Sequence, residues 1–431
     1  MSQGTDRRAW IVTAMLFAFM LINFADKAVL GLAAAPIIDE LKLTHTQFGQ
    51  VGSSFFLFFS LSAVVMGFVV NRVATKWALA AMGLVWALIQ LPMLMVVGLP
   101  MLLANRIILG AGEGPAYPVA LHAAYKWFPN EKRPLPTSLI ALGGAVGTGI
   151  VAPGITYVIL NYSWHAAFAL LGLFGMIWVL VWLVVGREGP LSADAANTAD
   201  AGTGRLPYSR LLTCRTVIGS MIVGFCAYWL LTLAVVWLPS YLTKGAGYSP
   251  TATGWIVTLP AFAQILLAPA ICALSQNLKT RGFSSRASRG ILGSCCVLLS
   301  GILTFFLPLV PPGVLPIVFT AFAFSIGSVI FSLGHVMVAE VTPIVQRGAI
   351  LGINNAVATL AGVFAPIVMG MMVDVGANAN EGFRTGFMIA GVLVTTGSLI
   401  GLLLIDPEAD IARFSRRQAS VPPLNVGAIR A

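Results

Sequence analysis

The stretch HAAFALLGLFGMIWVLVWLVVG, residues 165–186, runs for 22 residues without Asp, Glu, Lys or Arg. An α-helix needs about 20 apolar residues to cross the roughly 30 Å hydrocarbon core of a bilayer, so this stretch predicts a transmembrane helix. The whole chain follows the same pattern, because only 9% of its 431 residues are charged and 58% are hydrophobic. A soluble domain has about 25% charged residues. The apolar runs are continuous rather than alternating, which excludes a transmembrane β-barrel. The lipid bilayer is therefore the expected surroundings of this chain.

Eleven further apolar segments are long enough to span, and together the twelve predict an all-α membrane protein with two six-helix halves. The longest polar interruption contains SADAANTADAGTG, residues 192–204, whose small residues offer nothing to pack. We expect an N-terminal six-helix bundle over 1–190, a cytoplasmic linker over 191–212, a C-terminal bundle over 213–406 and a cytoplasmic tail over 407–431. The predicted spans are 10–35, 46–70, 77–97, 100–125, 136–160, 165–186, 214–242, 252–275, 290–310, 314–339, 348–374 and 385–405.

Basic residues are distributed unequally between alternate loops. Of the 25 Lys and Arg, Lys27 and Arg106 fall within spans, Lys42, Lys244 and Arg384 lie on one side, and the other twenty lie on the side of the termini. Because Lys and Arg accumulate in cytoplasmic loops, both termini are predicted to be cytoplasmic, in the inner membrane of the cell. The same rule explains the net charge of +10, so no nucleic acid partner is expected.

The sequence has no signature of an enzyme or of a bound metal. Its five cysteines form no CxxC pair and have no nearby histidine pair, and no HExxH, P-loop or GxSxG motif occurs. The loops are too short to fold a separate catalytic domain. We expect no cofactor, no metal and no obligate protein partner.

Four ionisable residues lie well inside predicted spans, all in the first half: Asp26, Lys27, Arg106 and Glu113. A charge in a span costs several kcal/mol, so such residues face a cavity or a partner and are functional candidates. Arg106 and Glu113 are about 700° of helical rotation and about 10.5 Å apart, on one face and two turns from each other. Each needs a partner on another helix, and Asp26 and Lys27 are the ionised candidates. The alternative is a buried ion-pair network that only holds helices together.

The charges of these four residues sum to zero. A bound organic anion would leave a buried excess of negative charge, which a proton on Asp26 or Glu113 would remove. Anion and proton should therefore bind cooperatively, which is a physical basis for symport.

Three motifs resemble the anion:cation symporter family of the major facilitator superfamily, which includes bacterial sugar-acid, tartrate and phthalate transporters and is related to sialin and the vesicular glutamate carriers. They are NFADKAVLGLAAAP at residues 23–36, RIILGAGEGPAYP at 106–118 with WFPNEKR at 127–133, and WLPSYL at 237–242. The resemblance implies the major facilitator fold, in which substrate binds near the midplane between two halves that rock against each other.

The resemblance also implies roles for individual residues. Asp26 and Glu113 correspond to the protonatable pair, and Arg106 to the principal anchor of a substrate carboxylate. Lys27 stands where the family usually has Arg, which keeps the charge but loses the planar fork. Phe59 and Gly144 stand where a Tyr and a Gln are common, so two hydrogen-bonding groups are absent.

The second half contributes polar and aromatic candidates for its wall of a substrate site: Tyr228, Trp229, Gln264, His335, Asn354 and Asn355. An amide in a span must find hydrogen-bond partners, which favours a ligand role for Asn355. The alternative for the aromatic residues is packing, and for His335 a structural hydrogen bond within the bundle.

These observations predict a proton-coupled symporter that imports an organic carboxylate by alternating access. With Phe59 and Gly144 in place of polar residues, a weakly hydroxylated or aromatic acid is favoured, because an unpaired hydroxyl in a pocket costs about 1–3 kcal/mol. An organic anion exchanger or a drug/proton antiporter on the same fold is the first alternative. A ligand sensor that binds without transporting is the second.

Overall fold

The computed structural model describes residues 3–69, 73–95, 98–128, 134–190, 206–311, 313–343 and 346–419. Within these ranges the regular structure is entirely helical, as predicted. Most of the expected linker, residues 191–205, and the end of the expected tail, residues 420–431, lie outside the described residues.

The first half contains the helices up to residue 185. A π-helical turn, Val146–Ile150, joins α7 to α8 within one span. The helices are α1 Gln3–Leu32, α2 Ala34–Leu41, α3 His45–Val69, α4 Thr75–Gln90, α5 Leu99–Glu113, α6 Ala116–Tyr125, α7 Pro134–Ala145, α8 Ala152–Asn161 and α9 Trp164–Val185.

The short helix α10, Tyr208–Leu212, lies at the end of the expected linker, directly before the second half. Its last helix, α21, lies in the expected tail and packs against α17 and α11. The other helices are α11 Arg215–Val236, α12 Leu238–Ser240, α13 Pro250–Ile256, α14 Leu259–Thr280, α15 Leu292–Phe306, α16 Val314–Ala323, α17 Ile330–Val341, α18 Arg347–Thr359, α19 Ala361–Val375, α20 Ala379–Leu404 and α21 Pro407–Ala419.

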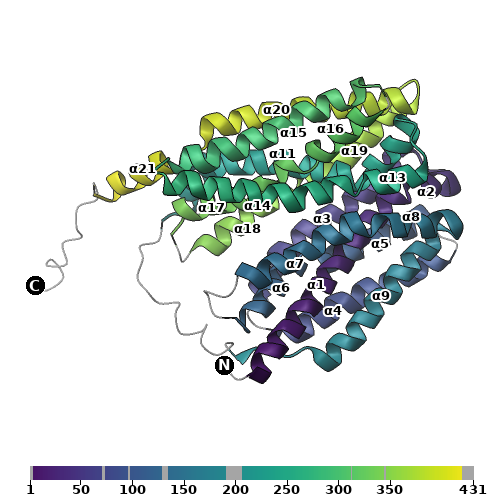
Figure 1. The fold of residues 1–431 in the computed structure, drawn as a ribbon, viewed down its shortest axis with the longest axis horizontal. Helices are drawn as coiled ribbons and strands as arrows, with labels where there is room; N and C mark the ends of the chain where they lie inside the picture. Colours follow the sequence, from purple (N-terminus) through teal and green to yellow (C-terminus); the bar gives the residue numbers. More distant parts are fainter. Residues whose placement is uncertain are drawn as a thin grey trace, which may run out of the picture.

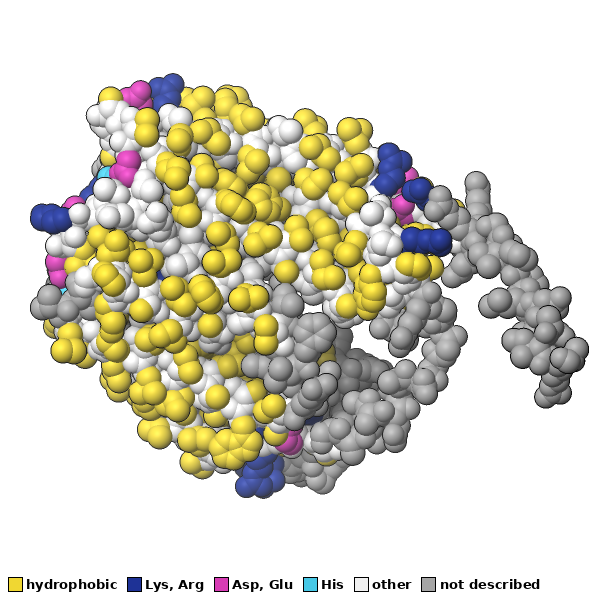
Figure 2. Space-filling view, turned by 180° about the vertical axis from the view of Figure 1, so that it is seen from behind, with side chains coloured by type: hydrophobic (Ala, Val, Ile, Leu, Met, Phe, Trp, Pro, Cys, Tyr) yellow, Lys and Arg dark blue, Asp and Glu magenta, His cyan; other side chains and the backbone are white. Residues whose placement is uncertain are grey.

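Ten helical stretches of the described chain are long and apolar enough to cross a membrane. Two further stretches complete the predicted twelve: α3, and the interrupted pair α5 and α6, which carries Arg106 and Glu113. The space-filling view shows the same division on the outside, with apolar side chains over the middle of the molecule and charged side chains toward its two ends (Figure 2). This distribution is expected for a protein whose central part lies in the hydrocarbon core of a bilayer.

The two halves lie beside each other, and the helices of both run roughly along the long axis of the molecule (Figure 1). α1 begins and α20 ends at the same end, which we call the terminal end. At the opposite end, which we call the closed end, α2, α8 and α13 bring the halves together. A Cβ on Gly31 of α1 would lie 1.9 Å from the carbonyl oxygen of Val235 in α11, so only glycine allows this approach.

Hydrogen bonds across the closed end involve Asp374, the single acidic residue of α19. Its carboxylate accepts from the backbone N–H groups of His45, at 2.9 Å, and Thr46, at 2.7 Å. It also accepts from His45 Nδ1 at 2.8 Å and from Thr46 Oγ1 at 2.6 Å. A carboxylate at this position caps the first turn of α3, where helix N–H groups are otherwise unpaired. The second half therefore supplies a capping group for a helix of the first.

Candidate functional site

Glycines bring α5 against α3. A Cβ on Gly110 would lie 2.2 Å from the carbonyl oxygen of Phe55, and one on Gly114 would lie 2.1 Å from that of Phe59. Pro115 follows directly, and because it has no backbone N–H it favours the break at which α5 ends and α6 begins. The sequence GEGP thus places Glu113 at a break within a span, close to α3.

Lys27 of α1 is the partner of Glu113. Lys27 Nζ lies 2.9 Å from Glu113 Oε2, and the two side chains are 6% and 0% exposed. Lys27 Nζ also donates to Asn23 Oδ1, one turn earlier in α1. Three phenylalanine rings surround the ammonium group, those of Phe24, Phe59 and Phe55, with centroids 4.3, 5.1 and 5.8 Å from Nζ. The ion pair is therefore enclosed by aromatic faces, to which a cation is attracted.

Asp26 points to a different part of the first half. Its Oδ1 accepts a hydrogen bond of 2.9 Å from Gln90 Nε2 of α4. The Gln90 side-chain oxygen in turn lies 3.4 Å from Asn105 Nδ2 of α5. Neighbouring residues in a helix point about 100° apart, which is why Asp26 and Lys27 meet different helices.

Arg106 lies in the interior of the first half. Its Nη1 donates to the backbone carbonyl of Asp26 at 3.3 Å, and its guanidinium lies 5.1 Å from the ring of Phe168 in α9. The main contacts of α9 are with helices of the first half. The structure thus places Arg106 among α1, α5 and α9, whereas the Lys27 ammonium lies beside α3, the helix that packs on α18 and α19 of the second half.

Several charged atoms of this buried group lack a hydrogen-bond partner among the described residues. They are Asp26 Oδ2, Glu113 Oε1 and the Nε and Nη2 atoms of Arg106. Buried polar groups are nearly always paired in folded proteins, so unpaired ones indicate a place for water, a proton or a ligand. The four charges form one ion pair and two incompletely paired groups.

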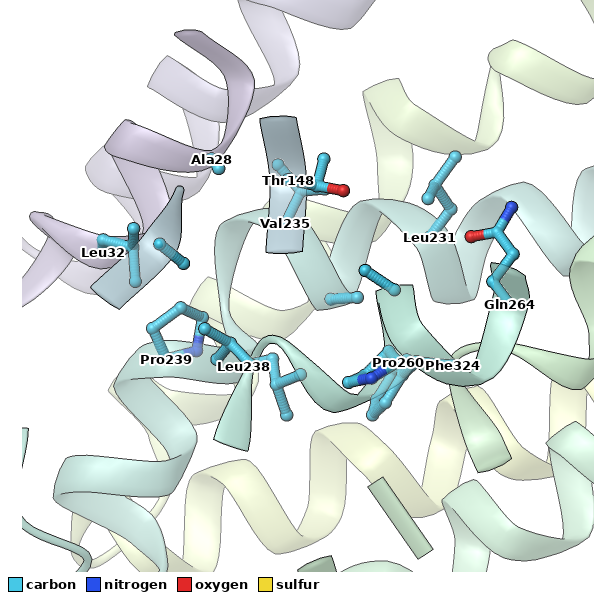
Figure 3. A pocket seen from close by; sticks show the side chains of 14 residues that line it. Ala28, Leu32, Thr148, Leu231, Val235, Leu238, Pro239, Pro260, Gln264 and Phe324 are labelled. Carbon is cyan, nitrogen blue, oxygen red and sulfur yellow. The ribbon is translucent and has the colours of Figure 1, made fainter. Parts of the chain in front are cut away.

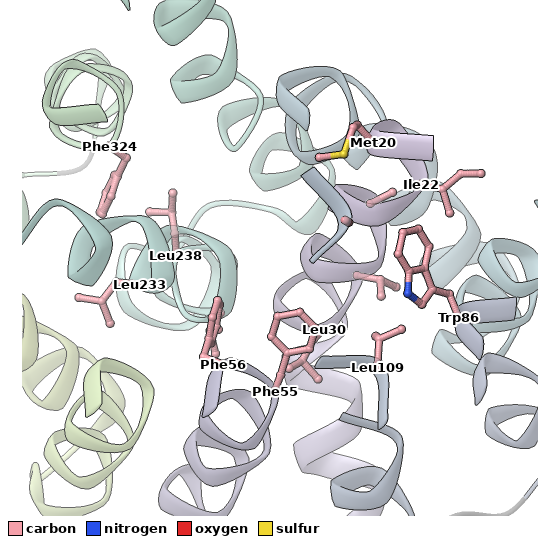
Figure 4. Packing of buried hydrophobic residues seen from close by; sticks show 14 of the residues in the cluster. Met20, Ile22, Leu30, Phe55, Phe56, Trp86, Leu109, Leu233, Leu238 and Phe324 are labelled. Atoms are coloured by element: carbon pink, nitrogen blue, oxygen red, sulfur yellow. The ribbon is translucent and has the colours of Figure 1, made fainter. Parts of the chain in front are cut away.

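Tyr228 connects this group to the second half. Its ring meets Phe56 of α3 and Phe331 edge to face, each at 6.0 Å between centroids. It also lies within electrostatic reach of Glu113. In Figure 4 the Phe56 ring lies on the side of Leu233 and Leu238 of the second half, whereas the neighbouring Phe55 ring lies beside Leu30 of α1. A series of aromatic contacts therefore leads from Lys27 through Phe55 and Phe56 to Tyr228 of α11.

Among the described residues, the other candidates of the second half form no hydrogen bond or ion pair with Lys27 or Glu113. Trp229 is buried and packs near Phe225, with 5.9 Å between ring centroids. His335 Nδ1 donates to the carbonyl of Phe331, one turn earlier in its own helix.

The two neighbouring asparagines of α18 differ in burial. Asn354 is 5% exposed, and its Oδ1 has no partner among the described residues. Asn355 is half-buried.

Gln264 lines a narrow pocket between the halves, together with residues of α1, α8, α11 and α14. Thr148 is the other polar side chain in its wall, and the remaining lining residues are apolar. In Figure 3 the Gln264 carboxamide and the Thr148 hydroxyl face the same space. Thr148 already donates to the carbonyl of Gly144 at 3.1 Å, which leaves Gln264 as the group best able to bind a polar ligand atom there.

Two buried amides at the site were not among the predicted residues. Gln90 and Asn105 are each 0% exposed and join Asp26 to α4 and α5. A neutral amide inside a predicted span was the available signal, because an amide in hydrocarbon must find a partner. The span 77–97 contains Gln90, and Asn105 directly precedes Arg106.

A family model and individual relatives both match this chain over most of its length. A family model described as the Major Facilitator Superfamily matches residues 15–249 and again 220–430. A hexuronate transporter of Bacillus subtilis (strain 168) is 26% identical over 405 residues, which cover 92% of this chain and 94% of that protein. A D-galactonate transporter of Escherichia coli O6:H1 is 27% identical over 430 residues, covering 93% and 96%.

A solved structure with the same fold is that of a bacterial homologue of the human lysosomal transporter Spinster, in an inward-facing and occupied conformation. The two chains are 15% identical, and the TM-score is 0.77 over 94% of this chain and 97% of the other.

Proposed function

Because the chain belongs to the major facilitator superfamily, whose members are transporters and not enzymes, we propose that it is a proton-coupled symporter that imports an organic carboxylate by alternating access. The relatives named for hexuronate and galactonate support an organic anion as substrate and confirm the resemblance to the anion:cation symporters. The basic terminal end is the cytoplasmic one in this proposal, and the closed end faces outward.

The observation that carries the proposal is the buried Lys27–Glu113 ion pair. Removing one partner of a buried pair leaves an uncompensated charge, which costs several kcal/mol. A proton on Glu113 would release Lys27, and a substrate carboxylate would then restore the balance of charge. Lys27 thus binds substrate only when Glu113 is protonated, which makes uptake depend on the proton.

Arg106 and Asp26 have supporting roles in this scheme. Their unpaired atoms lie in the same buried group, so a proton on Asp26 would also compensate for an added anion. The Arg106 guanidinium is held over Phe168, and we assign it to maintaining the charge balance rather than to first contact with the substrate. Tyr228, Gln264 and Asn354 are the groups through which the second half would contact the substrate.

The surroundings of Lys27 favour a weakly hydroxylated or aromatic acid over a sugar acid. The rings of Phe24, Phe55 and Phe59 occupy the space around its ammonium group. Beneath Phe24, a Cβ on Gly144 would lie 3.0 Å from the ring, so a longer polar side chain at 144 would displace it. Sugar hydroxyls would find few partners here, at about 1–3 kcal/mol for each one buried unpaired.

A thermal-shift screen on the purified protein tests the substrate class. It compares benzoate and other weakly hydroxylated acids with galacturonate and galactonate. Stabilisation by the sugar acids alone would refute the proposed preference and leave carboxylate transport intact.

Uptake into proteoliposomes separates the alternatives. A symporter accumulates the selected acid under an inward proton gradient without internal substrate, whereas an exchanger requires internal substrate and a sensor binds without flux. Lys27→Gln should abolish binding and Lys27→Arg should retain part of it. The matched control is Lys42→Gln, an exposed lysine at the closed end.

A further inference from the structure

A second pocket lies at the terminal end of the first half, on its outer surface. It is a cavity of about 180 Å³ between the start of α1 and the end of α9, with Trp127 forming part of its wall. Its other lining residues are Arg8, Ile11, Val12, Val184, Val185 and Arg187. Two arginines therefore flank an otherwise apolar pocket.

The two arginines are available for a ligand. Both are exposed, and within the described ranges neither belongs to an ion pair. Glu188, the carboxylate adjacent to Arg187, is bound instead by Lys126 and by Thr75 Oγ1, the latter at 2.8 Å. The acidic residue adjacent to Arg187 is thus already occupied.

Trp127 provides an independent observation. The residue is 5% exposed, and its indole Nε1 has no hydrogen-bond partner among the described residues. A buried indole N–H usually finds an acceptor. Trp127 is thus a lining residue of the pocket whose N–H is unpaired and itself covered by protein.

The apolar side of the pocket opens toward lipid. Val184 is 79% exposed and Ile11 is 41% exposed, in helices that cross the membrane. Trp10 is also 41% exposed and meets Phe128 edge to face at 5.4 Å. Tryptophan concentrates at the boundary between the acyl chains and the headgroups of a bilayer, which places the arginines at headgroup depth.

We propose that this pocket binds an anionic phospholipid. Its phosphate lies between Arg8 and Arg187, and one acyl chain lies along Ile11 and Val184. Basic pockets between transmembrane helices on the cytoplasmic side bind anionic headgroups in this manner. A soluble anion would gain nothing from the apolar surface, whereas a phospholipid uses both parts.

Native mass spectrometry of the delipidated full-length protein tests the proposal. Dioleoylphosphatidylglycerol is the anionic probe, and dioleoylphosphatidylcholine is the zwitterionic comparison. We expect each of Arg8→Gln and Arg187→Gln to weaken phosphatidylglycerol binding about fivefold, and the double variant about 25-fold. Phosphatidylcholine binding should not change.

The matched control is the double variant Arg281→Gln/Arg413→Gln, which removes two exposed arginines of the second half and should bind phosphatidylglycerol as the wild type does. Thermal unfolding verifies that each variant is folded. If the double variant does not fold, the phosphatidylglycerol affinities of the two single variants test the proposal. Equal phosphatidylglycerol affinity in wild type and variants would overturn the proposal. Displacement of the lipid by 10 mM inorganic phosphate would also overturn it, since it would show a site for a small anion.

Discussion

Asp374→Asn is expected to weaken the contact between the two halves at the closed end of the molecule. The carboxylate of Asp374 accepts four hydrogen bonds from His45 and Thr46, with donor–acceptor distances from 2.6 to 2.9 Å. An asparagine at 374 keeps one acceptor oxygen, so about two of these bonds are lost, together with the negative charge at the N-terminus of α3.

The free energy lost in Asp374→Asn follows from the strength of these hydrogen bonds and from how far their side chains are exposed to solvent. A hydrogen bond to a charged group contributes about 1.5–3 kcal/mol. The side chains of His45 and Asp374 are 25% and 27% exposed, so the lower end of that range applies. Losing two bonds then costs about 3 kcal/mol, which shifts the equilibrium between closed and open arrangements of this end about 150-fold toward open.

Distances between spin labels at Asn161 and Asn380, in a chain whose five cysteines have been replaced, measure this equilibrium. Both positions are exposed and lie in different halves near the closed end. The wild type should give mainly a short distance, and Asp374→Asn should add a second, longer one.

The control for this prediction is Asp39→Asn. It removes the other ion pair across this end, between Asp39 and Lys244 at 3.2 Å, whose carboxylate side chain is 69% exposed. An exposed pair contributes about 0–1 kcal/mol, so this variant should change the distances little. The reasoning is refuted if the distance distribution of Asp374→Asn equals that of the wild type, or if both variants shift it equally.

Three further predictions concern stability. Gln90→Leu leaves the Asp26 carboxylate without its donor and should lower the free energy of unfolding by about 1–3 kcal/mol; unchanged denaturant unfolding in detergent would contradict this. Gly110→Ala should lower the unfolding temperature, because the added Cβ would lie 2.2 Å from the backbone of α3, whereas Gly154→Ala, with nothing within 4 Å, should not. Burial raises the pKa of Glu188, but hydrogen bonds from three neighbouring groups outweigh it and hold the pKa below its ordinary value of 4.5. Its contribution to stability is therefore present above pH 4.5 and lost as the pH falls below that value, so the unfolding temperature of Glu188→Gln should depend less on pH in this range.

The twelve spans could be predicted because hydropathy is a local property of the chain. The predicted span 46–70 corresponds to α3, His45–Val69, and 165–186 corresponds to α9, Trp164–Val185. Breaks within spans were not predicted. The span 100–125 consists of two helices separated at Gly114 and Pro115, where close packing on α3 stabilises the interruption.

The ionisable members of the site could also be identified from the sequence, because a charge inside a span is costly wherever it occurs. Which of these residues pair with each other could not be predicted from the sequence. Whether Glu113 meets Lys27 or Asp26 depends on the rotation of α1 and on the close approach of α5, and both are set by contacts distant in sequence. The same limit applies to Asp374, whose hydrogen-bond partners in α3 are 328 and 329 residues away.

The central claim is that a proton on Glu113 frees Lys27 for a substrate carboxylate, and gradient-driven uptake by Glu113→Gln in proteoliposomes tests it most directly. The acid selected by the thermal-shift screen is supplied outside, with an inward proton gradient, and Glu381→Gln, an exposed residue of α20, is the control. We predict that wild type and control accumulate the acid above equilibrium, whereas Glu113→Gln exchanges internal for external acid without accumulating it. Accumulation by Glu113→Gln equal to that of the wild type would contradict the claim.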